Sequence, residues 1–417
     1  MLKEQHQGKL TKEQKILLNL ASMSVATTPL ALVLPKEELD GVDWKAIAEE
    51  SMAQAIGLSA YDAAAVYKEY IPKEVYTSWK LQSLKELKAG VRVALAQAEL
   101  IDILESNGVP YAIIKGTASA FYYPKPELRA LGDVDFLINP EEKEEIGRLL
   151  EENGYEKSCA DSEIHVVFEK EKAHLEMHLK ISGMPKTEHG ERIKSLFKNA
   201  LSERVEKVRD EHKFHSLDDI RHGIVLLLHT YHHLFSAGFG LRHLCDWAAF
   251  VASTQNQPFW EESLLPFLKE AGLMKFAAVL TKICVMYLCI SCPVWAEAED
   301  EQLCAEFLCD ILRSGNFGRK NNDRGKSAAL IAKPGEKRRS AVGTLAYKLH
   351  VSILDRYPIV KKVWILYPFV YAWKVVRNIF FILIKKRASI RQMKPEAIKR
   401  QKLYDKLRVF ETTSEEK

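Results

Sequence analysis

Two aspartates, Asp133 and Asp135, lie two residues apart in an apolar run that continues to Ile138. Because side chains alternate across a strand, a strand here places both carboxylates on one face and Val134 and Phe136 on the other. Two carboxylates side by side on an otherwise apolar strand are costly unless a cation neutralises them. The stretch therefore predicts a half-buried sheet that carries a cation-binding site.

A second strand candidate, residues 174–179, has polar side chains at every other position. Glu176 and His178 share one face, and apolar side chains occupy the other. Three carboxylates from adjacent strands suit Mg²⁺, which binds few protein oxygens and completes its shell with water and phosphate. We therefore predict that Asp133, Asp135 and Glu176 are catalytic residues that bind Mg²⁺ for phosphoryl or nucleotidyl transfer.

The turn before the aspartates has features that bind phosphate. An apolar strand candidate, residues 109–114, is followed by Lys115-Gly116-Thr117 and then by a helix expected over residues 118–123. A glycine lets a phosphate approach the backbone, and a helix N-terminus presents free N–H groups. We expect Gly116 and Thr117 to contact a nucleotide. Lys115 either neutralises triphosphate charge or points to solvent.

The order hydrophobic-x-Gly-Thr, Asp-x-Asp and x-Glu-x resembles the polymerase-beta-type nucleotidyltransferase superfamily. A narrower resemblance, over roughly residues 43–254, is to the family of uncharacterised bacterial nucleotidyltransferases, through Ile114-Lys115-Gly116, Pro126-x-Leu128-Arg129-x-x-Gly132-Asp133-x-Asp135, Glu176-x-His178 and His229-x-x-x-His233. The resemblance implies a mixed-sheet catalytic core, an NTP donor and Mg²⁺, but no particular acceptor. Many superfamily members have Gly-Ser in the turn, and Gly-Thr keeps the hydroxyl.

Four further side chains are candidates for the same site. Arg129 precedes the aspartate strand and either binds nucleotide phosphate or anchors its loop. His178 acts directly or supports the ligands around it. His229 and His233 lie four apart on an expected helix, residues 217–235, and either line the acceptor site or fill the core. Two histidines at this spacing can also bind zinc, but no glutamate follows His229, so a zinc protease is not supported.

Two other side chains have more than one possible role. His165 lies on a strand candidate that forms a hairpin with the strand of Glu176, so it can approach the site from across the pair. Asp246 is a candidate general base for an acceptor. It also lies four residues after Arg242 on an expected helix, and we favour an ion pair between these two.

The pattern of the whole chain predicts an α+β fold, with a small mixed-sheet nucleotidyltransferase core flanked by helices. We divide it into an N-terminal helical segment (1–108), the catalytic core (109–208), an all-helical domain (209–313), a flexible linker (314–342) and a basic amphipathic helical tail (343–417). Thr11 and Asp43 are expected helix N-caps, and residues 216–219, which include Asp218, are an N-cap signal for the helix expected over residues 217–235. A long helix over residues 75–106 is expected to pack on the sheet through apolar positions spaced three and four apart: Leu84, Leu87, Val91, Leu95, Ala98 and Ile101.

Charge is distributed unevenly along the chain. Residues 316–417 hold 25 Lys and Arg against 8 Asp and Glu, a net of +17, whereas the first 315 residues carry a net of −13. The basic end should therefore meet something anionic: nucleic acid, lipid head groups or the acidic body of its own chain. Residues 363–384 are apolar enough to suggest a membrane span, but Pro368, Lys374 and Arg377 argue against one. We expect an amphipathic helix that docks on the acidic body or on an anionic membrane surface.

These features predict a Mg²⁺-dependent nucleotidyltransferase that moves an NMP from an NTP, ATP foremost, to a hydroxyl of a small molecule such as a sugar, antibiotic or envelope precursor. The alternative is a non-catalytic nucleotide-binding or interaction protein on the same fold. No RNA-recognition signature is present, so nucleic acid is not the expected partner. The polar N-terminus and the odd count of 7 cysteines predict a cytoplasmic protein with reduced thiols, peripheral on a membrane if the tail binds lipid.

Overall fold

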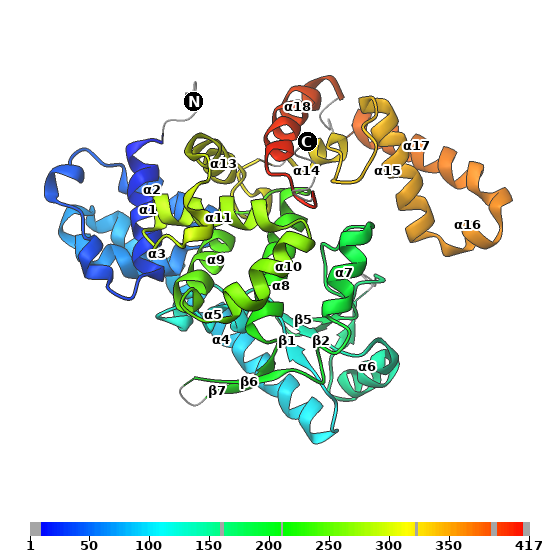
Figure 1. The fold of residues 1–417 in the computed structure, drawn as a ribbon, viewed down its shortest axis with the longest axis horizontal. Helices are drawn as coiled ribbons and strands as arrows, with labels where there is room; N and C mark the ends of the chain where they lie inside the picture. Colours follow the sequence, from blue (N-terminus) through cyan, green and yellow to red (C-terminus); the bar gives the residue numbers. More distant parts are fainter. Residues whose placement is uncertain (1–9, 159–161, 210–211, 322–323, 385–389, 412–417) are drawn as a thin grey trace.

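The sheet that carries Asp135 and Glu176 lies at one end of the molecule, with a helical body beside it and a separate group of helices beyond that body (Figure 1). The computed structural model describes residues 10–158, 162–209, 212–321, 324–384 and 390–411. The predicted α+β class is confirmed, with one mixed sheet of seven strands among many helices.

The strand order in the sheet is β3-β4-β5-β2-β1-β7-β6. At its centre, β2 pairs antiparallel with β1 and parallel with β5, in the register Asp135 to Glu176. The predicted hairpin is confirmed as the antiparallel pair β4 and β5. The strands are β1 Ala112–Ile113, β2 Val134–Leu137, β3 Glu156–Lys157, β4 His165–Lys170, β5 Ala173–His178, β6 Val205–Arg209 and β7 His212–Ser216.

One hairpin of the sheet was not foreseen. Strands β6 and β7 pair antiparallel, and β7 runs parallel to β1, so the sheet extends to Ser216 rather than ending at residue 208. The Ser216 hydroxyl donates a hydrogen bond to the carbonyl of Ile113 at 2.8 Å. Charged side chains along both strands hide the apolar alternation that usually marks a strand, because this edge of the sheet is largely exposed.

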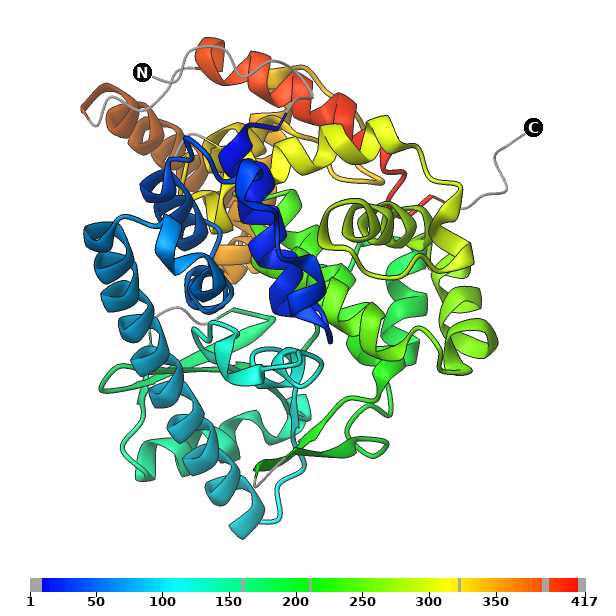
Figure 2. The ribbon, with the colours of Figure 1, turned by 90° about the vertical axis from the view of Figure 1, so that its left-hand side faces the viewer.

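Helices α4 (Lys73–Ser106) and α6 (Lys143–Glu152) cover one face of the sheet. Their buried side chains form a single core with the apolar face of the strands, including Phe136 and Met177. Figure 2 shows α4 as one long helix that reaches from the N-terminal helices to the sheet. The carboxylates of β2 and β5 are therefore on the other face, toward the helical body.

The predicted packing face of α4 is wrong, although the helix itself is confirmed. Leu84, Val91 and Leu95 are 48%, 51% and 65% exposed. The buried side chains are offset from that stripe: Trp79, Ser83, Val93, Ala96, Gln97, Leu100, Ile103 and Leu104. The first half of α4 contacts α3, and the second half contacts the sheet, so the buried face is set by two neighbours that the spacing of apolar residues does not reveal.

The helical body joins segments that are far apart in the sequence. The N-terminal helices α1 to α3 share one apolar core with the helices from α8 to α13. Thr11 caps α1, Asp43 caps α2 and Asp218 caps α8, as predicted. The helices from the N-terminus to residue 314, beyond those given above, are α1 Lys12–Val25, α2 Trp44–Ala53, α3 Gly57–Ala64, α5 Thr117–Ala120, α7 Glu188–Leu196, α8 Asp219–Leu234, α9 Leu241–Thr254, α10 Leu265–Glu270, α11 Met274–Leu288, α12 Val294–Glu297 and α13 Glu301–Ser314.

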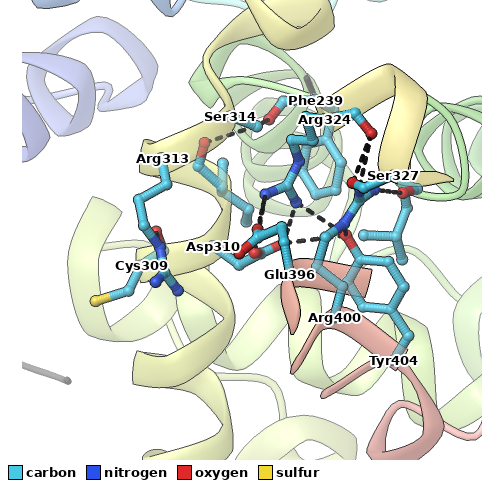
Figure 3. A network of polar contacts seen from close by, with 12 residues as sticks. Phe239, Cys309, Asp310, Arg313, Ser314, Arg324, Ser327, Glu396, Arg400 and Tyr404 are labelled. Atoms are coloured by element: carbon cyan, nitrogen blue, oxygen red, sulfur yellow. Dashed lines mark hydrogen bonds and ion pairs between the residues drawn. The ribbon is translucent and has the colours of Figure 1, made fainter. Parts of the chain in front are cut away.

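The segment 314–342, for which the sequence predicts a flexible linker, is anchored by a buried arginine. Arg324, at the start of α14 (Arg324–Ser327), is 2% exposed and pairs with Asp310 of α13 (Figure 3). Gly238 makes room for this packing, because its φ is +95° and a Cβ there would lie 2.7 Å from the Cβ of Ser314. The polar composition of the segment does not reveal that one charged residue has a buried partner.

The last helix, α18 (Ile390–Lys406), docks on the body at the same place. Arg400 donates hydrogen bonds to the carbonyl of Arg324 at 2.9 Å and to the carbonyl of Leu234, at the end of α8, at 3.2 Å. Tyr404 contacts both Arg324 and Asp310 within this network (Figure 3). Part of the basic end of the chain therefore packs on the acidic body, as expected.

The remaining helices extend from the body (Figure 1). This arm comprises α15 (Ala341–Arg356), α16 (Pro358–Lys362) and α17 (Tyr367–Ile384). It presents large apolar side chains to solvent: Trp364 at 77%, Ile365 at 69%, Phe369 at 72%, Trp373 at 51% and Val376 at 66% exposure. Among the described residues, no helix combines the length and the apolar content that crossing a membrane requires.

Candidate active site

The register of β2 and β5 brings the predicted catalytic residues together. Asp135 lies directly opposite Glu176, and ligand atoms of Asp135, Glu176 and His178 lie within 4.8 Å of one another. Asp133 immediately precedes β2, and the charges of Asp135 and Glu176 raise its pKa. We call Asp133, Asp135 and Glu176 the carboxylate cluster. Asp135 and Glu176 come together as the sequence predicted, whereas Asp133 is not part of the group of ligand atoms within 4.8 Å.

Asp135 is buried between Lys115 and His178. Lys115 forms an ion pair with it, and Nε2 of His178 lies 2.8 Å from its Oδ1. Burial alone would raise the pKa of Asp135, but Lys115 and His178 outweigh burial and hold this pKa well below its usual range. His178 also lies 3.4 Å from Glu176, and although its burial acts in the opposite direction, its contacts with Asp135 and Glu176 raise its pKa. His178 therefore supports two members of the cluster at once.

Asp133 is the member of the carboxylate cluster that has no direct contact with a cationic side chain among the described residues. Within the described part of the chain its carboxylate has neither a hydrogen bond nor an ion pair, and the charge of Asp135, together with burial, raises its pKa to about 6. A carboxyl group that resists ionisation because a second carboxylate is beside it is relieved by any cation that contacts both. These side chains therefore fit a divalent cation with a preference for oxygen ligands.

The turn at Gly116 has the geometry that only glycine adopts easily. Its φ of 58° and ψ of −111° lie outside the regions open to other residues, and this turn carries Lys115 to the carboxylate cluster. The Thr117 hydroxyl donates to Gln97 of α4. The helix expected over residues 118–123 is only the four residues of α5, because Tyr122 and Tyr123 leave the helix to reach partners elsewhere. A helix this short adds little dipole, so any phosphate binding here depends on the turn and Lys115.

Arg129 anchors the loop before β2. It is 8% exposed, and its Nε and NH2 atoms each lie 2.7 Å from an oxygen of Asp246. Tyr123 donates to the same carboxylate at 2.8 Å. The ion pair expected between Asp246 and Arg242 is therefore wrong, because the long-range partner Arg129 takes both carboxylate oxygens. Nucleotide binding by Arg129 stays a prediction, and the contact that the structure shows is the anchoring one.

Arg242 is a candidate that sequence reasoning missed. Its guanidinium lies 5.4 Å from the centre of the Phe317 ring, and its Nε is buried without a hydrogen-bond partner. Burial and the nearby Arg129 lower its pKa, while Asp246 and Asp133 oppose that change. Arg242 thus lies near both Asp246 and Asp133, and among the described residues no ion pair joins it to a carboxylate. The motif spacing gave no signal for this residue, since its position depends on how α9 packs.

His229 and His233 lie together, and a third imidazole joins them from the next helix. Ligand atoms of His229, His233 and His243 all lie within 4.8 Å of one another, and we call these residues the histidine cluster. Burial holds the pKa of each well below its usual range, with a further contribution from Lys115 to all three. His243 was not predicted, because only the packing of α9 against α8 brings it to the other two.

His165 approaches the site as expected. It pairs with His178 across the β4–β5 hairpin, and the two ring centres are 5.3 Å apart. A cavity of about 460 Å³ lies elsewhere, beside Tyr122, Tyr123 and Asp219, and no member of either cluster lines it. The chemistry that the sequence predicted is therefore at the sheet face and not in this cavity.

Comparison with known proteins gives one match. A protein-family model described as "Uncharacterised nucleotidyltransferase" matches residues 40–288. The matched region runs from just before α2 to the end of α11, so it includes the whole sheet and both clusters. No curated protein and no solved structure matches the chain.

Proposed function

The protein belongs to the uncharacterised nucleotidyltransferase family, whose model covers more than half of the chain, and on this premise we propose that it transfers an NMP from an NTP to a hydroxyl of a small molecule. Family membership supports nucleotidyl transfer in general terms. The observation that supports catalysis by this chain is the carboxylate cluster, in which Asp133 forms no ion pair among the described residues while Asp135 and Glu176 lie directly opposite each other. ATP is the NTP we propose first.

Asp133, Asp135 and Glu176 would hold Mg²⁺, the ion that best fits a set of carboxylate oxygens next to a phosphate. When bound, Mg²⁺ would neutralise phosphate oxygens and lower the pKa of the acceptor hydroxyl. His178 keeps Asp135 and Glu176 oriented through its contacts with both. These residues preorganise negative oxygen ligands before substrate arrives, which is the contribution a protein makes to such transfers.

Lys115, Gly116 and Thr117 would bind the triphosphate. Lys115 already contacts Asp135, so its ammonium group is held beside the position that a phosphate would take next to the cluster. The backbone of Gly116 has no side chain that would keep a phosphate away. The acceptor would bind between the sheet and α8, because the carboxylate face of the sheet is directed toward the helical body.

The acceptor we propose is a small hydroxylated molecule such as a sugar, an antibiotic or an envelope precursor. A non-catalytic nucleotide-binding protein remains the alternative, and the three carboxylates favour the enzyme over it. A protein that only bound nucleotide would not need a half-buried Asp133 whose ionisation is opposed by Asp135.

The test is transfer of label from an α-labelled NTP. Purified full-length protein with Mg²⁺ is incubated with each α-labelled NTP and a cell extract, in parallel with Asp133→Asn. Glu169→Gln, on the exposed side of the neighbouring strand β4, is the matched control. Label that moves to an extract component with wild type and the control, but not with Asp133→Asn, supports the transferase. Mg²⁺-dependent nucleotide binding without transfer from any NTP supports the non-catalytic alternative.

We also propose that the arm brings this transferase, as a cytoplasmic protein, to an anionic membrane surface. Ile365, Phe369, Trp373 and Val376 recur at helical spacing and are all exposed, so they form an apolar stripe with two large aromatic side chains along it. Residues 341–384 contain 6 basic and 1 acidic residue. Exposed aromatic side chains with basic residues around them are typical of helices that lie in the membrane interface.

Vesicle sedimentation tests this proposal. Full-length protein should sediment with vesicles of phosphatidylcholine and phosphatidylserine, and less with phosphatidylcholine alone. Phe369→Glu/Trp373→Glu should abolish sedimentation. Leu84→Glu is a matched control, because Leu84 is also an exposed apolar residue on a helix but lies on α4 rather than the arm. Equal sedimentation of Phe369→Glu/Trp373→Glu and wild type would contradict a role for the stripe.

A further inference from the structure

The histidine cluster is built from two consecutive helices, α8 and α9. His229 and His233 lie one turn apart on α8, and His243 projects from the first turn of α9. The ring centres of His229 and His233 are 4.5 Å apart, and those of His229 and His243 are 5.0 Å apart. Three imidazoles from two elements therefore converge on one point rather than spreading along a helix face.

The histidine cluster has polar atoms that lack partners. His243 is 4% exposed, and neither of its ring nitrogens has a hydrogen bond among the described residues. A buried polar atom without a partner typically destabilises a protein by about 1–3 kcal/mol, so it requires an explanation such as a bound ion or water. The ring of Phe317 covers the cluster, with its centre 4.5 Å from that of His233 and 5.5 Å from that of His243.

We propose that His229, His233 and His243 bind one divalent transition-metal ion of the zinc class, at a site separate from the carboxylate cluster. Neutral imidazole nitrogens suit Zn²⁺ and its first-row neighbours, whereas Mg²⁺ prefers the oxygen ligands of Asp133 and Asp135. The two sets of side chains therefore select different ions. Three protein ligands leave one coordination position open, as in zinc sites that bind water or a substrate atom.

The charges around the histidine cluster permit a cation. Lys115 and Arg242 lie near it and oppose protonation of His229 and His243. Carboxylates offset them: Asp135 pairs with Lys115, and Asp133 and Asp246 lie close to Arg242. The positive charges beside the histidine cluster are thus balanced by carboxylates, and they leave no uncompensated field that would repel the ion.

His222 shows what distinguishes the cluster from an ordinary buried histidine. It lies on the same helix, is 1% exposed and also lacks hydrogen bonds to both ring nitrogens. Its ring, however, stacks on Tyr122 and makes a tilted contact with Phe250, and no second histidine joins it in a group of metal-ligating atoms among the described residues. His222 is therefore the matched control for substitutions in the cluster.

Metal content and Co²⁺ spectroscopy of the full-length protein test the proposal without depending on activity. Protein stripped with chelator and reloaded with Zn²⁺ should retain about one ion per chain after desalting, as three protein ligands predict. Co²⁺-loaded protein should show the strong visible absorption of a four-coordinate ion. Both signals should be lost in His243→Asn and His229→Asn and kept in His222→Leu.

Glu176→Gln separates this site from the carboxylate cluster, because it changes that cluster and leaves the ion pair of Lys115 and Asp135 in place. It should keep the Zn²⁺ and the Co²⁺ spectrum, even though transfer is lost. Loss of the ion in Glu176→Gln but not in His243→Asn would overturn the proposal, and so would a stripped and reloaded wild type that retains no metal. If His243→Asn does not fold, Zn²⁺ should still raise the thermal unfolding temperature of wild type and Glu176→Gln, and no rise in either would also overturn it.

Discussion

The carboxylate cluster and the histidine cluster lie near each other but differ in whether their buried polar atoms have partners. Asp135 is buried and contacts Lys115 and His178, whereas neither ring nitrogen of His243 has a hydrogen-bond partner among the described residues. The first cluster consists of charged oxygen ligands on a rigid sheet, and the second of neutral nitrogen ligands on two helices. The comparison teaches that a site on adjacent strands can be predicted from the alternation of polar and apolar residues in the sequence. A site that depends on how two helices pack cannot be predicted in this way. Each prediction below tests one side of this contrast.

Asp135→Asn should have the largest effect. It removes the carboxylate that joins Lys115, His178 and the expected metal, and loss of about 4 kcal/mol of transition-state stabilisation corresponds to a decrease of about 10³-fold in the rate of transfer. The rate of label transfer at saturating NTP measures it. Glu169→Gln should stay within about twofold of wild type, and a similar decrease in that control would show that the loss is not specific to the cluster.

Arg129→Met should destabilise the fold more than it changes nucleotide affinity. It leaves Asp246 buried without its main partner, and breaking a buried ion pair in this way destabilises a protein by about 3–5 kcal/mol. Chemical denaturation measures the free energy of unfolding. Arg129→Met/Asp246→Leu should recover part of the loss. Unchanged stability with a large rise in the Kd for NTP would instead assign Arg129 to nucleotide binding.

Gly116→Ala should destabilise the turn that carries Lys115 toward both clusters. A non-glycine residue forced into this backbone conformation costs about 1–3 kcal/mol. The free energy of unfolding should fall by that amount, and transfer should decrease because Lys115 shifts. Gly90→Ala is the matched control, since a Cβ at Gly90 meets no atom and the residue lies within α4. A neutral result at Gly116 would mean that the turn adjusts freely.

The two clusters should have opposite effects on the pH dependence of stability in metal-free protein. The pKa of Asp133 is raised from 3.8 to about 6, so its stabilising contribution is present at low pH and lost as pH rises through that window. The pKa of His233 is lowered from 6.5 to about 3, so its contribution is present above pH 6.5 and lost as pH falls toward 3.

Removing each group separates these opposing contributions. Unfolding free energies between pH 4 and 6.5 should fall less steeply on acidification in His233→Asn, and more steeply in Asp133→Asn, by about 1 kcal/mol per pH unit for one proton. Denaturant titrations with chelator present measure both slopes. Slopes that change in the same direction would mean that the two groups are not in the protonation states described here.

The face of the sheet that carries the carboxylate cluster could be predicted, because its residues are close in sequence and recur at every second position. Asp133, Asp135 and Glu176 needed only the assumption that two apolar stretches are adjacent strands. His243, Arg242 and the partner of Asp246 could not be found, because each depends on how α9 packs against segments more than 100 residues away or on the angle between two helices.

The helical parts show the same division between local and long-range information. The caps at Thr11, Asp43 and Asp218 are local hydrogen bonds and were predicted correctly. The buried face of α4 was not, because two different neighbours share the helix. The anchor at Arg324 was hidden for a related reason: a polar segment reads as a linker unless its distant carboxylate partner is known.

The return of the chain at α18 changes how the basic end of the protein should be regarded. Gln401 hydrogen-bonds both backbone groups of Ala332, at 2.8 Å to the N–H and 3.3 Å to the carbonyl, so the chain leaves the body and comes back to the same point. The arm, α15 to α17, is therefore a loop between two anchored points of the chain and not a trailing end. The cost of closing such a loop grows only slowly with its length. The arm could thus be shortened, replaced or moved to another scaffold as a module, while α18 stays in place and continues to hold the end of α8.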